Sequence, residues 1–166
     1  MMGHWIIAPV VLPAVTGAFA LLALRDAPIV ARSISTAATA LLLAIALWLL
    51  HGATVHGAEA YFLGNWPAPF GIVLVLDRLS ALMVTLTATL ALVVQLYAIG
   101  TGWDLRGRHF HALWQFQLMG VCGAFLTGDA FNLFVFFEVL LIASYGLMIH
   151  GGGAPRTRAG IQYVAF

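Results

Sequence analysis

The stretch "TGDAFNLFVFFEVLLIASYG", residues 127–146, is almost wholly apolar and yet carries Glu138 near its middle. An apolar run of about 20 residues is long enough for a helix to cross the roughly 30 Å hydrocarbon core of a bilayer. A charged side chain at that depth costs a few kcal/mol, and acids in such places usually mark proton or ion pathways. The stretch therefore predicts a membrane helix with a functional carboxyl group.

The composition of the whole chain agrees with this prediction. Of the 166 residues, 63% are hydrophobic and only 8% are charged, too few to cover the surface of a soluble domain. We therefore expect a single membrane domain, residues 1–166, surrounded by the lipid bilayer. There is no basic patch with interleaved aromatic residues, which argues against nucleic acid as a partner. The only cysteine, Cys122, excludes an intrachain disulfide and is expected to fill space in a helix.

The predicted fold class is all-α, a polytopic bundle of about five transmembrane helices. Strands of a membrane barrel would alternate polar and apolar residues, and these runs do not. The helices are expected at residues 5–24, 33–50, 79–100, 112–128 and 130–149, and the third could begin as early as Gly71.

The basic residues predict the orientation. All seven are arginines, and with five crossings six of them fall on one side of the membrane, leaving only Arg78 on the other. Because basic residues accumulate in cytoplasmic loops, the N-terminus is expected outside and the C-terminus in the cytoplasm.

An outer loop is expected at residues 51–70. It contains "YFLGNWPAPFG", with Tyr61, Phe62, Trp66 and Phe70 around a Gly-Asn turn and two prolines. These aromatic residues are typical of an anchor at the membrane–water interface. The alternative is a short hairpin that grips a neighbouring subunit.

Glu138 is the main candidate for function. Low-dielectric surroundings favour the neutral acid and a nearby cation favours the carboxylate, so a group under both influences can accept and release a proton. The alternative is a protonated Glu138 that only hydrogen-bonds between helices. Tyr145 lies seven residues further on the same helix face and would serve a water-lined path or act as an interfacial anchor.

Three more charged residues lie at predicted helix starts. Asp129 precedes the apolar run and is expected to cap the helix. Asp77 and Arg78 open the third helix on the outer side. They either have a structural role or line the outer mouth of an ion path.

Other functional classes find little support. Gln95, Gln115 and Gln117 are expected to hydrogen-bond between helices. The six histidines lie at helix ends or in loops, whereas axial haem ligands lie within facing helices. The "HFH" of residues 109–111 is expected to be interfacial rather than a metal site. No motif of an enzyme is present, so neither a cofactor nor a metal is expected.

Two longer stretches carry a family resemblance: "LGNWPAPFGIVLVLDRLSALM" and "GAFLTGDAFNLFVFFEVLLIASYGLM". They resemble the D subunit of the Mrp-type (Pha-type) cation/proton antiporters, bacterial inner-membrane complexes related to the proton-pumping subunits of respiratory complex I. "GRHFHALWQFQLMG" and "YGLMIHGGG" are most similar to the potassium form.

The resemblance implies a proton half-channel in which the glutamate at position 138 pairs with a lysine on a later helix. It also matches Asp77 and Arg78 to the family's Asp-Arg at the outer end of the third helix. Family members have roughly fourteen helices, whereas this chain has no lysine and ends as a sixth helix would begin. We therefore expect an N-terminal fragment of a larger antiporter-like subunit.

The predicted function is that of a transporter subunit rather than an enzyme. It would act with other subunits of a hetero-oligomeric complex to expel K⁺ or Na⁺ in exchange for protons, with Glu138 as the protonatable group. The alternatives are a proton-translocating subunit of a quinone-linked oxidoreductase and a non-conducting membrane fragment.

Overall fold

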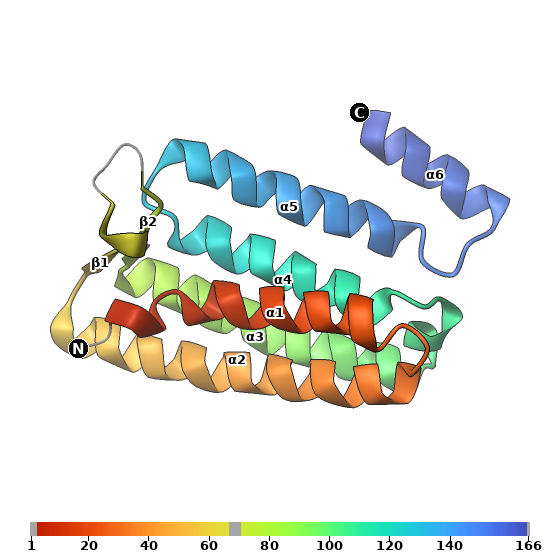
Figure 1. Ribbon diagram of the computed structural model, residues 1–166, viewed down its shortest axis with the longest axis horizontal. Coiled ribbons are helices and arrows are strands. Elements are labelled where there is room, and N and C mark those ends of the chain that lie inside the picture. Colours follow the sequence, from red (N-terminus) through yellow and green to blue (C-terminus); the bar gives the residue numbers. More distant parts are fainter. Residues whose placement is uncertain (1–2, 67–70, 166) are drawn as a thin grey trace.

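The computed structural model describes residues 3–66 and 71–165 of the chain. Helices α1 to α4 lie side by side, and α5 runs along one flank of this group (Figure 1). α1 packs on α2 and α4, α2 packs on α3, and α5 packs mainly on α4. The helices are α1 (Ala8–Ala23), α2 (Pro28–His56), α3 (Arg78–Gly100), α4 (Phe110–Leu126), α5 (Ala130–Met148) and α6 (Ala154–Ala165).

The prediction of an all-α membrane fold is confirmed. Helices α2, α3 and α5 are long and apolar enough to cross a bilayer, and α1 is a shorter apolar helix. The number of crossings and their orientation stay predictions.

Helix α2 is longer than the helix expected at residues 33–50, because backbone signals outside the apolar run set its ends. Pro28 lies in the first turn, where a missing N–H costs nothing. Gly57 follows the last residue with φ of 83°, a conformation that suits glycine. The resulting 29-residue helix includes residues 51–56, which were expected to begin the outer loop.

The rest of that predicted loop is partly regular. It contains β1 (Glu59–Phe62) and a 3₁₀ turn at Leu63–Asn65, while residues 67–70 lie outside the described residues. β1 pairs with β2 (Val73–Leu76) in an antiparallel hairpin. The prediction that the third helix could begin as early as Gly71 is therefore wrong, since α3 begins at Arg78.

The hairpin is bonded to the turn between α4 and α5. The N–H of Gly128 donates to the carbonyl of Val73 at 2.8 Å, and Leu74 pairs with Thr127 in an isolated bridge. A Cβ atom at position 128 would lie 2.7 Å from Cγ2 of Val75, so the close approach requires glycine. The start of α5 is thereby held against the sheet.

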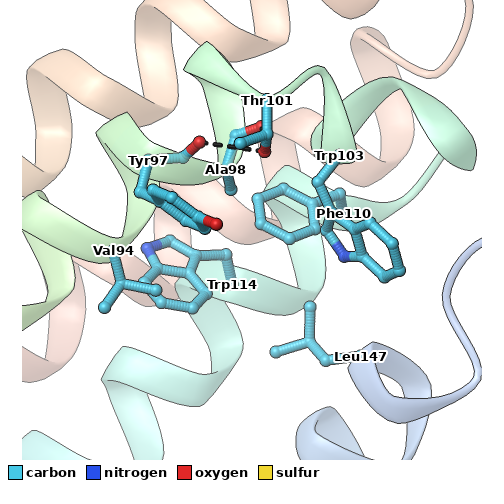
Figure 2. A pocket seen from close by; sticks show the side chains of 8 residues that line it. All are labelled: Val94, Tyr97, Ala98, Thr101, Trp103, Phe110, Trp114 and Leu147. Atoms are coloured by element: carbon cyan, nitrogen blue, oxygen red, sulfur yellow. Dashed lines mark hydrogen bonds between the residues drawn. The ribbon is translucent and has the colours of Figure 1, made fainter.

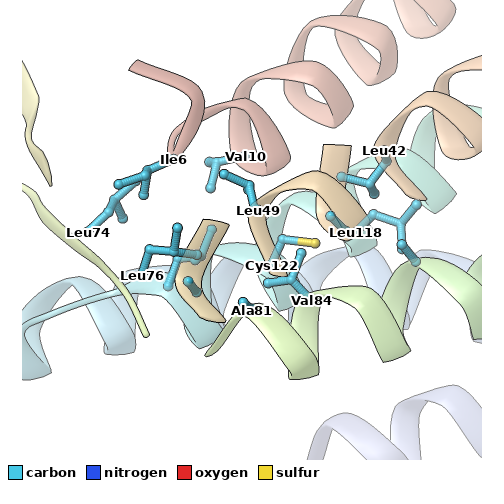
Figure 3. Packing of buried hydrophobic residues seen from close by; sticks show 14 of the residues in the cluster. Ile6, Val10, Leu42, Leu49, Leu74, Leu76, Ala81, Val84, Leu118 and Cys122 are labelled. Atoms are coloured by element: carbon cyan, nitrogen blue, oxygen red, sulfur yellow. The ribbon is translucent and has the colours of Figure 1, made fainter. Parts of the chain in front are cut away.

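Next to the hairpin, buried apolar side chains, most of them from α1 to α4, form the core (Figure 3). Leu74 and Leu76 of β2 are buried there, and Cys122 packs among them as an apolar side chain. The core also includes Ile6, Val10, Leu42, Leu49, Val84 and Leu118.

Two glycines of α4 let α5 come close. A Cβ atom at Gly120 would lie 2.7 Å from the backbone nitrogen of Leu140, and one at Gly123 would overlap the ring of Phe136. Small residues commonly allow membrane helices to pack at short distance. The face of α5 that carries Phe136 and Leu140 is therefore turned towards α4.

Buried amides join α2, α3 and α4. Gln95 accepts a hydrogen bond from Thr39 at 2.7 Å and donates to Ser35 at 2.9 Å. Gln115 donates to the same two side chains at 3.0 Å. The interhelical bonds predicted for Gln95 and Gln115 are confirmed, whereas the side-chain oxygen of Gln117 is buried without a partner among the described residues.

A charged cluster lies nearer the arginine-rich end of the bundle. Asp104, in the 3₁₀ turn η3 (Trp103–Arg106), accepts two hydrogen bonds from the Arg32 guanidinium, at 2.8 and 2.9 Å. Nε2 of His111 donates to the same carboxylate at 3.1 Å. The Asp104 side chain has no exposed surface. This cluster ties α2, the α3–α4 connection and α4 together.

The turn after α5 is tied to η3 in turn. Nε2 of His150 donates to the carbonyl of Trp103 at 3.0 Å, and Arg156 donates to the carbonyl of His150 at 2.8 Å. The His150 ring rests on Gly107, where a Cβ atom would lie 2.8 Å from it. Both ends of α5 are therefore held by hydrogen bonds.

The close α4–α5 contact predicts the effect of a single methyl group. Gly120→Ala should lower the free energy of unfolding by about 1–3 kcal/mol, since the backbone of Leu140 must move away. Thermal unfolding followed by circular dichroism in detergent measures the change. Gly100→Ala is the matched control, because a Cβ at this last residue of α3 meets nothing within 4 Å. Equal stability of the two variants would contradict the packing.

The Asp104 cluster predicts a dependence of stability on pH. Burial alone would raise the pKa of Asp104, but its hydrogen bonds from Arg32 and His111 outweigh burial and hold the pKa below the usual range. This stabilisation is thus present above about pH 4 and is lost as the pH falls below the ordinary aspartate value. Unfolding temperatures measured from pH 6 to pH 3 should fall steeply for the native protein.

Asp104→Asn isolates the contribution of this group. The variant should be less stable by about 3 kcal/mol at pH 6, because the Arg32 charge loses its partner. It should also show a flatter decline between pH 5 and pH 3. Asp26→Asn, at an exposed position, should follow the native curve. A decline of native steepness in Asp104→Asn would show that other groups cause it.

Candidate functional site

Glu138 lies at the middle of α5 and on its exposed face. Successive helical residues are about 100° apart, so Glu138 points about 200° away from Phe136, which faces α4. Its neighbours one or two turns away are exposed as well: Phe131 by 76%, Phe134 by 62% and Ile142 by 66%. The packing of α5 on α4 therefore places the carboxyl group on the side of α5 that faces away from α4.

The side chain of Glu138 has no hydrogen bond or ion pair with residues 3–66 or 71–165. Only 11% of the α5 span is buried, compared with 39% for α2 and 33% for α3. Acids within membrane helices almost always face protein or a water-filled cavity rather than lipid. The outward face of α5 thus exposes one carboxyl group among apolar side chains.

Asp129 is the N-cap residue of α5. One carboxylate oxygen accepts from the N–H of Asn132 at 2.7 Å and the other from its side-chain amide at 2.6 Å. These two bonds, the side-chain bond first, hold the pKa of Asp129 below its ordinary value. Asp129 lies nine residues before Glu138, which is about 14 Å along the helix. It therefore fixes the start of α5 and does not touch Glu138.

Asp77 and Arg78 lie at the same end of the bundle. Asp77 caps α3, accepting from the N–H of Ser80 at 2.6 Å, while the Ser80 hydroxyl accepts from the N–H of Asp77 at 2.8 Å. The backbone hydrogen bond from Ser80 lowers the pKa of Asp77. Arg78 is exposed and donates to the carbonyl of Thr54 on α2 at 3.4 Å. Neither residue contacts Glu138.

Tyr145 lies near the other end of α5, about 10 Å along the helix from Glu138. Its ring packs edge-on against Tyr163 of α6, with 5.7 Å between the ring centroids. The candidate residues are therefore arranged along the bundle: Asp77, Arg78 and Asp129 at the hairpin end, Glu138 at the middle, and Tyr145 towards the opposite end.

The Asp104–Arg32–His111 cluster was missed by the sequence analysis. The only local signal was an acid between two predicted helices, seven residues before a histidine, and interfacial loops commonly have such residues. The arginine partner, Arg32, lies 72 positions away in the sequence. Within the described ranges, no three His, Cys, Asp or Glu side chains come together as metal ligands. His111 is instead part of the ionic cluster.

Proteins named as antiporter subunits align with almost the whole chain. It is 47% identical to the D subunit of a probable K⁺/H⁺ antiporter of Rhizobium meliloti, over 98% of this chain and 31% of that protein. It is 40% identical to the D subunit of the Na⁺/H⁺ antiporter of Bacillus subtilis, over 99% of this chain and 34% of that protein. No family model matches. The chain thus spans about a third of the length of these relatives.

Solved structures show the same fold. The Mrp complex from Dietzia sp. contains a chain that superimposes with a TM-score of 0.86 at 29% identity, over 98% of this chain and 31% of that one. A chain of the membrane-bound sulfane sulfur reductase, an archaeal respiratory complex, gives a TM-score of 0.85 at 24% identity, over 96% of this chain and 33% of that one. Nearly the whole chain is therefore homologous to a segment of the D subunits of the Na⁺/H⁺ and K⁺/H⁺ antiporters, and this segment is about a third of their length.

Proposed function

We propose that this chain is part of a membrane subunit of a multisubunit cation/proton antiporter and that Glu138 is its protonatable group. The observation that carries the proposal is an acid at the middle of an apolar helix, on the face directed away from the bundle. The names of the homologous D subunits supply the class of transported ions.

Glu138 would work by alternating between two charge states. The neutral acid is favoured when the surroundings are apolar, and the carboxylate is favoured when a cationic group approaches. The sequence contains no lysine, and its arginines lie near the helix ends, so a cation opposite Glu138 has to come from outside the described residues. The exposed face of α5 leaves room for such a group and for water that carries the proton.

The exchange would use the gradients across the bacterial inner membrane. Uptake of protons from outside would drive K⁺ or Na⁺ out of the cytoplasm, which supports pH and salt homeostasis. Each elementary charge that crosses the membrane field carries about 2.3 kcal/mol per 100 mV. The remaining subunits of the complex would complete the ion paths.

Two substitutions of Glu138 test the role of the carboxyl group. In the assembled complex, Glu138→Gln should abolish cation-driven proton exchange in inverted membrane vesicles, measured with a pH-sensitive dye, because the amide cannot ionise. Glu138→Asp should keep part of the activity, because it ionises but is shorter. The amount of complex in the membrane is measured alongside.

The matched control is Glu59→Gln, which changes the other glutamate of the chain, in β1. It should leave exchange at the native level. Native exchange by Glu138→Gln, with normal amounts of complex, would show that the carboxyl group has a structural role only.

A further inference from the structure

An apolar groove opens at the arginine-rich end of the bundle, between the last turn of α3, η3, the start of α4 and the end of α5. It encloses about 410 Å³. Figure 2 shows the side chains that converge on it from these elements. They include Val94, Tyr97, Trp103, Phe110, Trp114 and Leu147.

The groove has the composition of a membrane interface. Tyr97 is 72% exposed, and tyrosine and tryptophan gather where the bilayer meets water. Phe110 and Trp114 stack with 5.9 Å between centroids and form one wall. Nε1 of Trp114 is buried without a hydrogen-bond partner in the described part of the chain. The walls are therefore apolar, with few polar atoms near them.

Two cations lie against Trp103, one of the residues that line this groove. The guanidinium carbon of Arg156 lies 4.3 Å from the centroid of the Trp103 ring, and that of Arg106 lies 4.6 Å from it. Stacking on an aromatic ring stabilises a guanidinium without neutralising it. Neither arginine has a carboxylate partner within residues 3–66 and 71–165, and Asp104 already binds Arg32 and His111. Arg156 also donates to the carbonyl of His150, and Arg106 lines a neighbouring hollow together with Asp26. Neither guanidinium charge is neutralised by an ion pair among the described residues.

We propose that this groove binds an anionic diacyl phospholipid, with its phosphate between Arg106 and Arg156 and an acyl chain along the apolar walls. Guanidinium groups bind phosphate oxygens through charge-assisted hydrogen bonds. Basic pockets between membrane helices on the cytoplasmic side suit acidic headgroups, and the arginine distribution predicts that this end is cytoplasmic. Two other occupants fit less well. A free anion would leave the apolar groove unfilled, and an apolar helix would leave Arg106 and Arg156 without a counter-charge.

The test uses the protein in the assembly it forms in the membrane, reconstituted into phosphatidylcholine vesicles. A trace of phosphatidylglycerol with a photoactivatable acyl chain is added, and labelled residues are mapped by mass spectrometry. Labelling is expected at Tyr97, Trp103 and Leu147. Unlabelled phosphatidylglycerol should displace the probe at about 25-fold lower concentration than phosphatidylcholine, a factor of about five for each arginine.

Arg106→Gln separates the ionic contact from the shape of the groove. Arg106 is exposed, so the variant should fold, and the probe should bind about fivefold more weakly. Arg108→Gln, two residues away and exposed but not stacked on the Trp103 ring, should bind as the native protein does. Arg156→Gln provides a second measurement, with a similar loss.

Three results would overturn the proposal. Equal displacement by the two lipids would remove the selectivity for anionic headgroups. Displacement by inorganic phosphate would show a site for free anions. A groove that stays unlabelled in the native assembly would show that a protein segment covers it. The readout is lipid labelling, so the outcome is independent of whether Glu138 carries protons.

Discussion

The packing of α5 against two glycines of α4 is the contact on which the position of the candidate site depends. Gly120 leaves room for the backbone of Leu140, and Gly123 leaves room for the ring of Phe136. The face of α5 that carries these two residues therefore packs on α4. Helix geometry then directs Glu138 to the opposite side. Among the described residues, no hydrogen bond or ion pair joins Glu138 to α1 to α4. The bundle acts as a support that presents the carboxyl group rather than as a cavity that encloses it.

The two ends of the bundle are built from different interactions. At the hairpin end, main-chain bonds and helix caps do the work: Val73 accepts from Gly128, and Asp77 and Asp129 each satisfy the first N–H groups of a helix. At the other end, side-chain charge dominates, with Asp104 buried among its partners and two arginines stacked on Trp103. The apolar core, and the hydrogen bonds of Gln95 and Gln115 to hydroxyl groups of α2, join the two ends.

The sequence was sufficient to predict the features that depend on hydropathy and on single residues. The all-α membrane class and the placement of Glu138 within an apolar helix follow from the apolar runs themselves. A short hairpin was only the alternative for residues 51–70, and its pairing with residues 73–76 could not be predicted, since "VLVL" is apolar throughout and shows no alternation. The bond between Arg32 and Asp104 joins residues 72 positions apart, and such pairs are set by helix packing rather than by local pattern. Which side of α5 faces outward likewise depended on the neighbour of Gly120.

The hydrogen bonds at both ends of α5 have a mechanical consequence. Gly128 is attached to Val73 and His150 to Trp103, so α5 can neither slide along its axis nor rotate without breaking one of these attachments. A proton acceptor on such a helix stays in one place and does not move with the proton. If Glu138 exchanges protons, water molecules and the opposing cation have to move towards it, while the carboxyl group keeps a constant depth in the membrane.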